Sequence, residues 1–414
     1  MAEVTTPRIY TNDAFDQKDF LKDYHLTACT SLLKWVLTMV ANDVPIINGK
    51  ISTNVLIFAL NRCKEYLHMK QNRDIDIPIQ KKATSGQWNF FLKSYFTLIN
   101  CHDVFLVERT NIFSLLIAYA KILLKNIHKY RPQLNCEGFH NIWVMKSADP
   151  RDREIKMASN LRVITEWKNS ASSEYVIQKY IEEPLLIHET KFDIKQYYLI
   201  TTVYPLEIWM YKDCYLRFSS QKYTLKSFHR SIHQTSYAVQ RKGKHFTGRH
   251  CELPTCNTWN LRAYKNYLRR NAKESVWNKI IYPGMKQAIV GIMLSSQSLL
   301  PFPHHFSKGR FGLYGCDFIL DKEFRPWLME IKSCPDLNPT TKVTSKFCKS
   351  LIRDVFKVII DYPHNPNAKT GKFECVYREP VTHIRQQELF VRGHQLPVDY
   401  FDCESEDEKK PQIL

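Results

Sequence analysis

Glycine is scarce in this sequence, with 12 glycines among 414 residues, against about 7% in an average chain. No glycine lies between Gly138 and Gly243, so this stretch lacks the residue that lets a backbone approach a phosphate closely. No run of about 18 uncharged apolar residues occurs, so we expect no membrane span. The longest apolar stretch, residues 110–120, is predicted to be a buried helix. The first residues lack the apolar segment of a secretory signal.

The cysteines form no paired framework, because the 12 cysteines are scattered along the chain. This distribution favours a reducing compartment over a disulfide scaffold. Acidic residues are outnumbered, and the formal net charge of +18 predicts an acidic partner: nucleic acid, anionic lipid or an acidic protein segment. The aromatic and basic motifs of known nucleic-acid modules are missing, so charge alone supports a nucleic-acid binder. No nucleophile signature supports covalent acyl catalysis.

Hydrophobic periodicity predicts a mixed α+β chain, with helices first and strands after them. After an irregular arm (1–20), the predicted helices are 24–42, 51–70, 88–99, 111–127, 276–299 and 341–362. The predicted strands are 141–146, 161–167, 174–181, 195–205, 206–220 with a turn near Lys212, and the hairpin 313–332. The basic segment 221–250 is expected to be a loop, and the charged tail 399–414 to be disordered.

The hairpin LYGCDFILDKEFRPWLMEIK (313–332) carries two acidic residues that a turn centred on Glu323 and Phe324 would place opposite each other. These are Asp317 and Glu330, with Cβ atoms expected about 5 Å apart. Two facing carboxylates repel each other unless a cation lies between them, and Mg²⁺ prefers such oxygen ligands. Lys332 lies on the same strand face and could neutralise the pair as a salt bridge. The spacing leaves the metal site and the ionic cluster equally open.

A second candidate lies in NIWVMKSADPRDREIKM (141–157), where an apolar strand ends at Lys146. A lysine there can direct its charge at a phosphate, although a lysine at a strand end is more often solvated. Arg151 and Arg153 add guanidinium groups suited to phosphate oxygens, whereas Asp152 and Glu154 oppose them. The loop contains no glycine, which a close backbone approach to phosphate normally requires.

Two further stretches carry weaker signals. QKYIEEPLLI (178–187) and KFDIKQYYLI (191–200) predict a strand, a proline break and a second strand. The backbone of 178–181 could accept the edge of an adenine. His245, His250, Cys251 and Cys256 raise the possibility of zinc, but their spacing matches no firm zinc pattern.

Taken in order, several segments resemble the tubulin-tyrosine-ligase-like family over roughly residues 50–380. They are NIWVMK, YVIQKYIEEPLLI, KFDIKQYYLI, YLRFSS, YGCDFIL and PWLMEIKSCP, while HNIWVMK, PGMKQAI and CPDLNPTTKVTS are most similar to the glycylase branch. The resemblance implies an ATP-grasp-like α+β fold, in which a helical N-terminal region precedes β-rich subdomains that hold ATP between them. It also implies three parts: an arm and first helix (1–50), the ligase domain (51–380) and a charged, disordered tail (381–414).

The resemblance further implies an ATP- and Mg²⁺-dependent ligase that joins glycine to glutamate side chains in acidic tubulin tails through an acyl phosphate. Tubulin and microtubules are then the partner, and the location is cytoplasmic, on the cytoskeleton and the axoneme of cilia or flagella, with no membrane or nucleic-acid partner expected. By position, Arg217 and Lys195 match catalytic residues, and Asp317 and Glu330 match metal ligands. The implied ATP-binding residues are Lys146, Arg151, Arg153, Gln178, Lys179, Tyr180, Ile181, Lys191 and Asp193.

The sequence departs from the family pattern on the phosphate and metal side. Asp152 and Glu154 stand where the family's loop has glycines, Lys195 replaces an arginine, and Lys332 replaces an asparagine that completes the magnesium site. The strand 178–181 keeps the family pattern. An alternative interpretation is therefore a family member with impaired catalysis, which binds acidic tubulin tails without efficient ligation.

Overall fold

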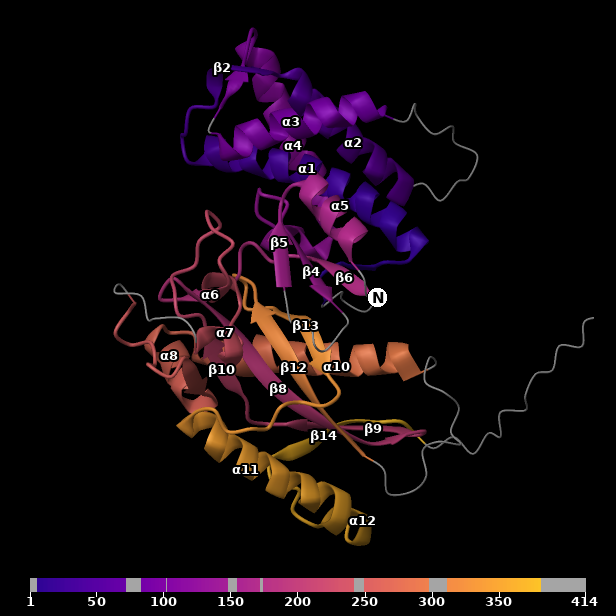
Figure 1. The fold of residues 1–414 in the computed structure, drawn as a ribbon, viewed down its shortest axis with the longest axis vertical. Helices are drawn as coiled ribbons and strands as arrows, with labels where there is room; N and C mark the ends of the chain where they lie inside the picture. Colours follow the sequence, from indigo (N-terminus) through magenta and orange to yellow (C-terminus); the bar gives the residue numbers. More distant parts are fainter. Residues whose placement is uncertain are drawn as a thin grey trace, which may run out of the picture. The chain divides into compact units, whose positions relative to one another are not determined.

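The computed structural model describes residues 6–71, 83–101, 103–147, 155–171, 174–241, 249–297 and 311–380. These residues form helices and antiparallel sheets (Figure 1), which confirms the α+β class. They belong almost entirely to the compact unit Met1–Arg378. The tail expected over 381–414 lies outside the described residues.

The helices are α1 (Ala14–Ala41), α2 (Asn54–Gln71), α3 (Ser85–Asn100), α4 (Thr110–His128), η1 (Pro132–Cys136), α5 (Leu161–Ser170), α6 (Arg230–His233), α7 (Tyr237–Gln240), α8 (Leu261–Arg270), α9 (Glu274–Val276), η2 (Trp277–Ile281), α10 (Tyr282–Gln297), α11 (Lys342–Phe356), η4 (Lys357–Asp361) and α12 (Tyr362–His364). The strands are β1 (Ile9–Thr11), β2 (Ile47–Ser52), β3 (Phe105–Leu106), β4 (Trp143–Ser147), β5 (Ile155–Ala158), β6 (Tyr175–Lys179), β7 (Leu186–Ile187), β8 (Thr190–Val203), β9 (Leu206–Tyr211), β10 (Tyr215–Phe218), β11 (Thr258–Asn260), β12 (Gly312–Leu320), β13 (Pro326–Lys332) and β14 (Phe373–Arg378).

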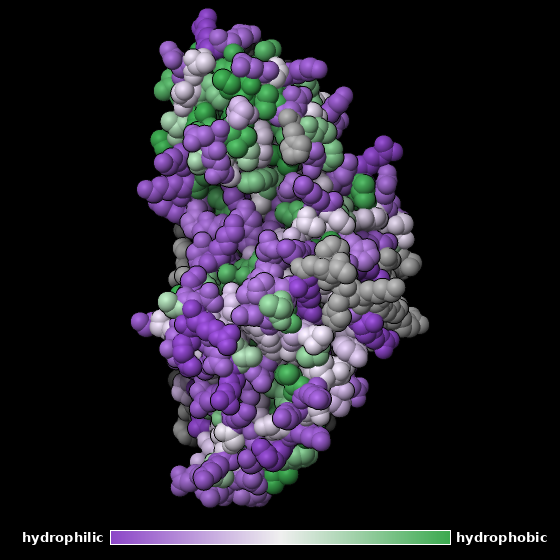
Figure 2. Space-filling model, turned by 90° about the vertical axis from the view of Figure 1, so that its left-hand side faces the viewer, coloured by the Kyte–Doolittle hydropathy of each residue, from purple (hydrophilic) through white to green (hydrophobic). Residues whose placement is uncertain are grey.

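The N-terminal helices α1 to α4 pack around one apolar cluster that includes Leu32, Leu56, Phe91 and Phe113. Helix α3 starts at Thr84, whose side chain accepts from the backbone N–H of Gln87 in a reciprocal capping box. On the face shown in Figure 2, hydrophobic residues gather mainly over these helices. The four helices predicted in this region are thus present, each with shifted ends.

Helix α4 is long and apolar enough to cross a membrane by length and composition alone. Its buried side chains, among them Phe113, Leu123 and Ile127, pack into the N-terminal cluster. Leu115 and Ile122 are 69% and 57% exposed. The expectation of a buried helix therefore holds for one face of α4 only.

A small antiparallel sheet, in the order β1-β6-β4-β5, follows the helices. Strand β1 pairs with β6 and α1 begins at Ala14, so the expectation of an irregular arm over residues 1–20 was wrong. The predicted strand 161–167 was also wrong, because these residues form α5. Asn160 caps that helix by accepting from the N–H of Arg162, and Ile164 is its buried contact with the sheet.

The large sheet has eight antiparallel strands, with the central order β11-β10-β8-β12-β13. Strand β9 continues the sheet by pairing with both β8 and β14, and the predicted break between 206–211 and 215–218 is present. The segment 221–250, expected to be a loop, contains the short helices α6 and α7, and its residues 242–248 lie outside the described residues.

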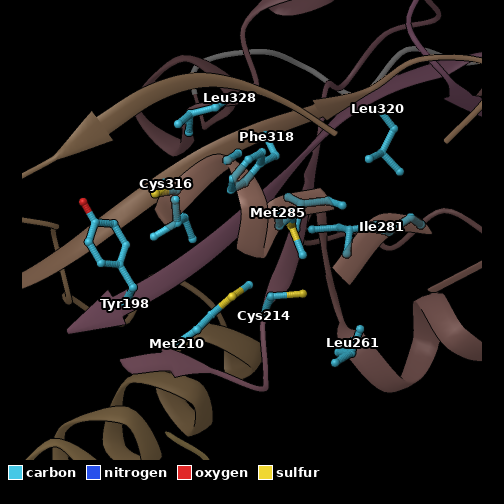
Figure 3. Packing of buried hydrophobic residues seen from close by; sticks show 14 of the residues in the cluster. Tyr198, Met210, Cys214, Leu261, Ile281, Met285, Cys316, Phe318, Leu320 and Leu328 are labelled. Carbon is cyan, nitrogen blue, oxygen red and sulfur yellow. The ribbon is translucent and has the colours of Figure 1, made fainter. Parts of the chain in front are cut away.

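The two faces of the large sheet have different covers (Figure 1). On one face, Tyr198, Phe318 and Leu328 pack against residues of α8, η2 and α10, such as Met285 (Figure 3). On the other face, Tyr197 and other aromatic residues pack against α11. The alternation of side chains along β8 produces these two faces, because successive residues in a strand point to opposite sides. Residues 193 and 195 therefore share the face of Tyr197.

Candidate active site

The sequence-predicted charged residues converge on the α11 face of the large sheet. Strand pairing places Asp317 opposite both Lys195 of β8 and Glu330 of β13. Arg217 of β10 lies opposite Asp193 of β8. Residues opposite each other in antiparallel strands have side chains on the same face. The sheet thus gathers on one face residues that lie up to 137 positions apart in the chain, from 193 to 330.

Asp317 is the centre of an ionic cluster. Its Oδ2 lies 2.7 Å from the Nζ of Lys195 and 3.0 Å from the Nζ of Lys332. Lys332 also lies 3.6 Å from Glu330, and Lys195 lies 3.5 Å from Asp193. Burial alone would raise the pKa of Asp317, but the two ammonium groups hold that pKa below its usual range. Asp317 is therefore an ionised carboxylate that orients two lysines.

The predicted register of the hairpin agrees with the structure at the pair of Asp317 and Glu330. Asp317 pairs with Glu330, although a shift in register follows, because Phe318 pairs with Leu328. The extra residue on β13 is a β-bulge. An unbroken ladder with a turn centred on Glu323 and Phe324 predicts the same pair, but it does not predict the bulge.

The residues present do not form a magnesium site. Within the described parts of the chain, no group of three or more His, Cys, Asp or Glu side chains could hold a metal ion. Asp317 already accepts from two ammonium groups, and Lys332 contacts both carboxylates of the pair. A protonated lysine has no lone pair for a cation. We therefore derive no step through Mg²⁺ at this position.

Lys146 approaches the cluster from the small sheet. Its Nζ donates to the side-chain oxygen of Gln178 at 2.8 Å and to the backbone oxygen of Met329 at 3.5 Å. Gln178 also donates to Met329 O at 3.4 Å. Burial lowers the pKa of Lys146, and Glu330 and Asp317 oppose that effect. These contacts connect β4 and β6 to β13, so that Lys146 faces the same region as Asp317 and Glu330.

The side chain of Lys179 is enclosed and serves the fold. It is 0% exposed, and its Nζ contacts Glu182 at 2.8 Å and the backbone oxygens of Ile142 and Tyr180. Its backbone N–H donates to the backbone oxygen of Arg8, the residue before β1. Any contact of Lys179 with a nucleotide would therefore have to come from its carbonyl group. Ile181 packs into a small apolar cluster with Trp327.

Lys191 and Tyr180 form a buried pair with His233. The Nζ of Lys191 donates to Tyr180 Oη at 3.2 Å and to His233 O at 2.7 Å. His233 Nε2 lies 2.7 Å from Ser227 O, so Nε2 carries the proton and Nδ1 accepts from Tyr180 Oη at 2.9 Å. Burial lowers the pKa of His233 to about 4. A neutral His233 thus fixes the positions of Tyr180 and Lys191.

Asp193 offers a free acceptor to the site. Thr235 donates to its Oδ2, while its Oδ1 is buried without a hydrogen-bond partner in the part of the chain that the structure describes. A buried carboxylate oxygen without a donor requires an explanation, and a bound ligand is one. The guanidinium of Arg217 stacks 5.5 Å from the ring centre of Tyr215. Both groups are therefore available to a ligand.

Several residues predicted from the sequence lie outside the residues that the structure describes or away from the ionic cluster. Two residues that contribute to the site, His233 and Thr235, were not predicted. Arg151 and Arg153, with Asp152 and Glu154, lie outside the described residues, as does His245. His250 stacks on His188, with ring centres 3.7 Å apart. His233 and Thr235 lie in the segment expected to be a loop, where no periodic pattern marks them.

Comparisons with known proteins identify the family to which the chain is similar. The sequence profile described as Tubulin-tyrosine ligase family matches residues 103–368. The chain is 36% identical over 410 residues to Tubulin glycylase 3A of Drosophila melanogaster, with 95% of this chain and 40% of the relative covered. For Tubulin monoglycylase TTLL3 of Danio rerio, the identity is 32% over 411 residues, with 92% and 52% covered.

A third relative, Protein monoglycylase TTLL8 of Homo sapiens, is 34% identical over 401 residues, with 88% of this chain and 46% of the relative covered. The chain spans about half the length of the curated relatives it matches. The resemblance to the family and to its glycylase branch is confirmed. The chain belongs to the tubulin-tyrosine ligase family.

Proposed function

We propose that this chain is an ATP-dependent ligase that joins glycine to glutamate side chains in the acidic tails of tubulin. The observation that carries the proposal is the convergence of Lys146, Lys195 and Lys332 on one acidic region of the large sheet. Relatives named tubulin glycylases and monoglycylases support the choice of glycine and tubulin. The proposed location is accordingly the microtubule cytoskeleton, including the axoneme.

The proposed chemistry needs no covalent enzyme nucleophile. The γ-phosphoryl group of ATP passes to a glutamate carboxylate of the tail, which yields an acyl phosphate and ADP. The amine of glycine then attacks the acyl carbon, an amide bond forms, and phosphate leaves. Such phosphoryl chemistry depends on positioning and on cations around the phosphate oxygens.

In the proposal, the side chains of this site supply both the positioning and the positive charge. The ammonium groups of Lys146 and Lys195 balance negative charge on phosphate oxygens, and Asp317 holds Lys195 in place at 2.7 Å. The unpartnered Oδ1 of Asp193 accepts a hydrogen bond from a ligand hydroxyl or amine. Arg217 provides a planar guanidinium for a carboxylate, either of glycine or of the tail. The adenine lies near the carbonyl groups of 179–181, in an ATP-grasp-like arrangement.

A direct assay tests the proposal. Tubulin is incubated with radiolabelled glycine, Mg·ATP and the native chain, and the label on tubulin is measured. Asp317→Asn should lower labelling by about 100-fold, because both lysines lose their orientation. Asp213→Asn is the matched control: it removes an ion pair with Lys372 at 2.6 Å, on a residue between β9 and β10 and outside the ionic cluster, and should leave labelling unchanged. Equal labelling by the native chain and Asp317→Asn would contradict the proposed site.

A second function is favoured by one observation, the ammonium of Lys332 between Asp317 and Glu330. Under this alternative, the chain binds acidic tubulin tails without efficient ligation. Pelleting with microtubules in the absence of nucleotide, combined with no labelling of tubulin, would support it. Loss of pelleting after removal of the tubulin tails would separate tail binding from nonspecific adhesion.

A further inference from the structure

The end of the β12–β13 hairpin has an unusual charge arrangement. Asp317 and Glu330 face each other in the ladder, and the Nζ of Lys332 lies 3.0 Å from one carboxylate and 3.6 Å from the other. Gly315 lies directly opposite Lys332 and has no side chain to compete for this face. The ammonium group of Lys332 therefore lies between the two acids.

We propose that Lys332 acts as a built-in cation at this position, so that the site binds polyphosphate through lysine ammonium groups without a divalent metal between Asp317 and Glu330. The inference refines how the proposed ligase supplies positive charge. Its main test measures metal binding and does not depend on ligation.

The first argument is geometric. In a nucleotide site, Mg²⁺ takes one or two carboxylates together with phosphate oxygens and waters at about 2.1 Å, so the two facing carboxylates could ligate it only if they were free of other cations. The Oδ2 of Asp317 already contacts two ammonium groups, at 2.7 and 3.0 Å. A metal bound between the acids would have to displace Lys332 from both of them.

The second argument is electrostatic. A divalent ion within a few ångströms of an ammonium group is repelled twice as strongly as a monovalent ion at the same distance. The three acids of the cluster, Asp193, Asp317 and Glu330, are matched in number by Lys146, Lys195 and Lys332, with Lys191 and Arg217 nearby. An anionic ligand therefore meets compensating positive charge from the chain itself.

The test uses Mn²⁺, a paramagnetic substitute for Mg²⁺, titrated into the full chain and followed by electron paramagnetic resonance. At Mn²⁺ concentrations where Lys332→Asn binds the ion, the native chain should leave it free in solution. The affinity of the variant for Mn²⁺ should be higher by about tenfold or more. Lys332→Arg keeps the charge and should show no gain. The matched control is Lys322→Asn on the same hairpin, which removes an exposed pair with Glu183 and should also show no gain.

Two results would overturn the inference. One is native Mn²⁺ binding as tight as that of Lys332→Asn, and the other is a gain in Lys332→Asn no larger than in Lys322→Asn. A readout on the native chain removes any dependence on how the variants fold. The affinity of the native chain for a fluorescent ADP analogue should change by less than about threefold when EDTA is added. A loss of affinity of about tenfold or more would contradict the inference. If ADP does not bind at all, the proposed function fails, while the Mn²⁺ result still decides the role of Lys332.

Discussion

At the residue scale, the lysines in and around the candidate site have different roles. Lys179 is fully buried and holds Glu182, which also accepts from the backbone N–H groups of His140 and Ile142. Lys195 is 9% exposed and holds Asp317, whereas Lys332 is 43% exposed. The environment of each ammonium group assigns its role, because a buried charge must be paired and an exposed charge need not be. Sequence spacing identified the acidic partners of Lys332 but not those of Lys179 and Lys195.

A partly buried histidine gives a prediction about pH. His25 stacks on Trp88 with ring centres 4.1 Å apart, and burial lowers its pKa to about 4. The unfolded imidazole takes up a proton below about pH 6.5, whereas the folded one stays neutral. Its contribution to stability is therefore present above about pH 6.5 and is lost as the pH falls towards 4. His25→Phe should reduce this loss, measured as the urea midpoint between pH 7 and pH 4.

The control for this prediction is His364→Phe, which changes an exposed residue at the end of α12. This variant should show the same dependence of the urea midpoint on pH as the native chain. His233 also has a pKa lowered by burial, so His25→Phe is expected to remove only part of the dependence. If the urea midpoint of His25→Phe depends on pH as steeply as that of the native chain, the imidazole of His25 does not contribute to the pH dependence of stability.

At the scale of elements, the first strand is fixed by a buried ionic network. The Nε of Arg8 lies 2.6 Å from Asp23 of α1, its NH1 group contacts Glu137, and Arg131 lies 2.6 Å from Asp23. These contacts hold β1 against β6 and α1. The sequence of the first residues shows no strand periodicity over three positions, so the network that orders them could not be predicted.

Removing Arg8 tests whether this network stabilises the element. Arg8→Met should lower the free energy of unfolding by about 3 kcal/mol, because the buried Glu137 would keep only the longer ion pair with Arg131, at 3.9 Å, among the described residues. Lys22→Met, which removes a neighbouring exposed pair with Asp19, should change it by no more than about 0.5 kcal/mol. Urea denaturation measures both values. Similar values for the two variants would show that the network is not stabilising.

Helix α5 shows why one predicted strand was wrong. Its residues include apolar and β-branched side chains that fit a short strand as well as a helix. Asn160 as a cap and the exposed pair of Arg162 with Glu166, four residues apart, favour the helix. Only Ile164 of α5 is buried, so the strand-like alternation never had to match a sheet. Short apolar segments remain ambiguous until the surface they cover is known.

At the scale of the whole molecule, the net charge of +18 is the property most directly tied to an acidic partner. Electrostatic attraction of this kind weakens when salt screens the charges. The charge alone does not distinguish partners, which is why the functional proposal rests on the family membership and on the ionic cluster around Asp317.

Salt dependence gives a prediction at this scale. Binding to an immobilised glutamate-rich peptide should weaken by more than about tenfold as the ionic strength rises from about 0.1 M to about 1 M, where the screening length falls from about 10 Å to about 3 Å. Surface plasmon resonance measures the affinity. A peptide with glutamine in place of glutamate is the control and should bind weakly throughout. Binding that does not respond to salt would point to apolar recognition.

The sequence by itself determined the α+β class, most of the helices and strands, and the facing of Asp317 and Glu330, because these depend on local periodicity and on the turn between two strands. The sequence also offered Lys332 as the cation between them, and the tertiary structure decided which other cations approach the pair. Lys195 of β8 contacts Asp317, and Lys146 of β4 reaches the backbone of β13 from the other sheet, so their positions depend on strand order and packing. Local sequence spacing cannot specify these positions, because they arise only when distant strands pair and the two sheets come together.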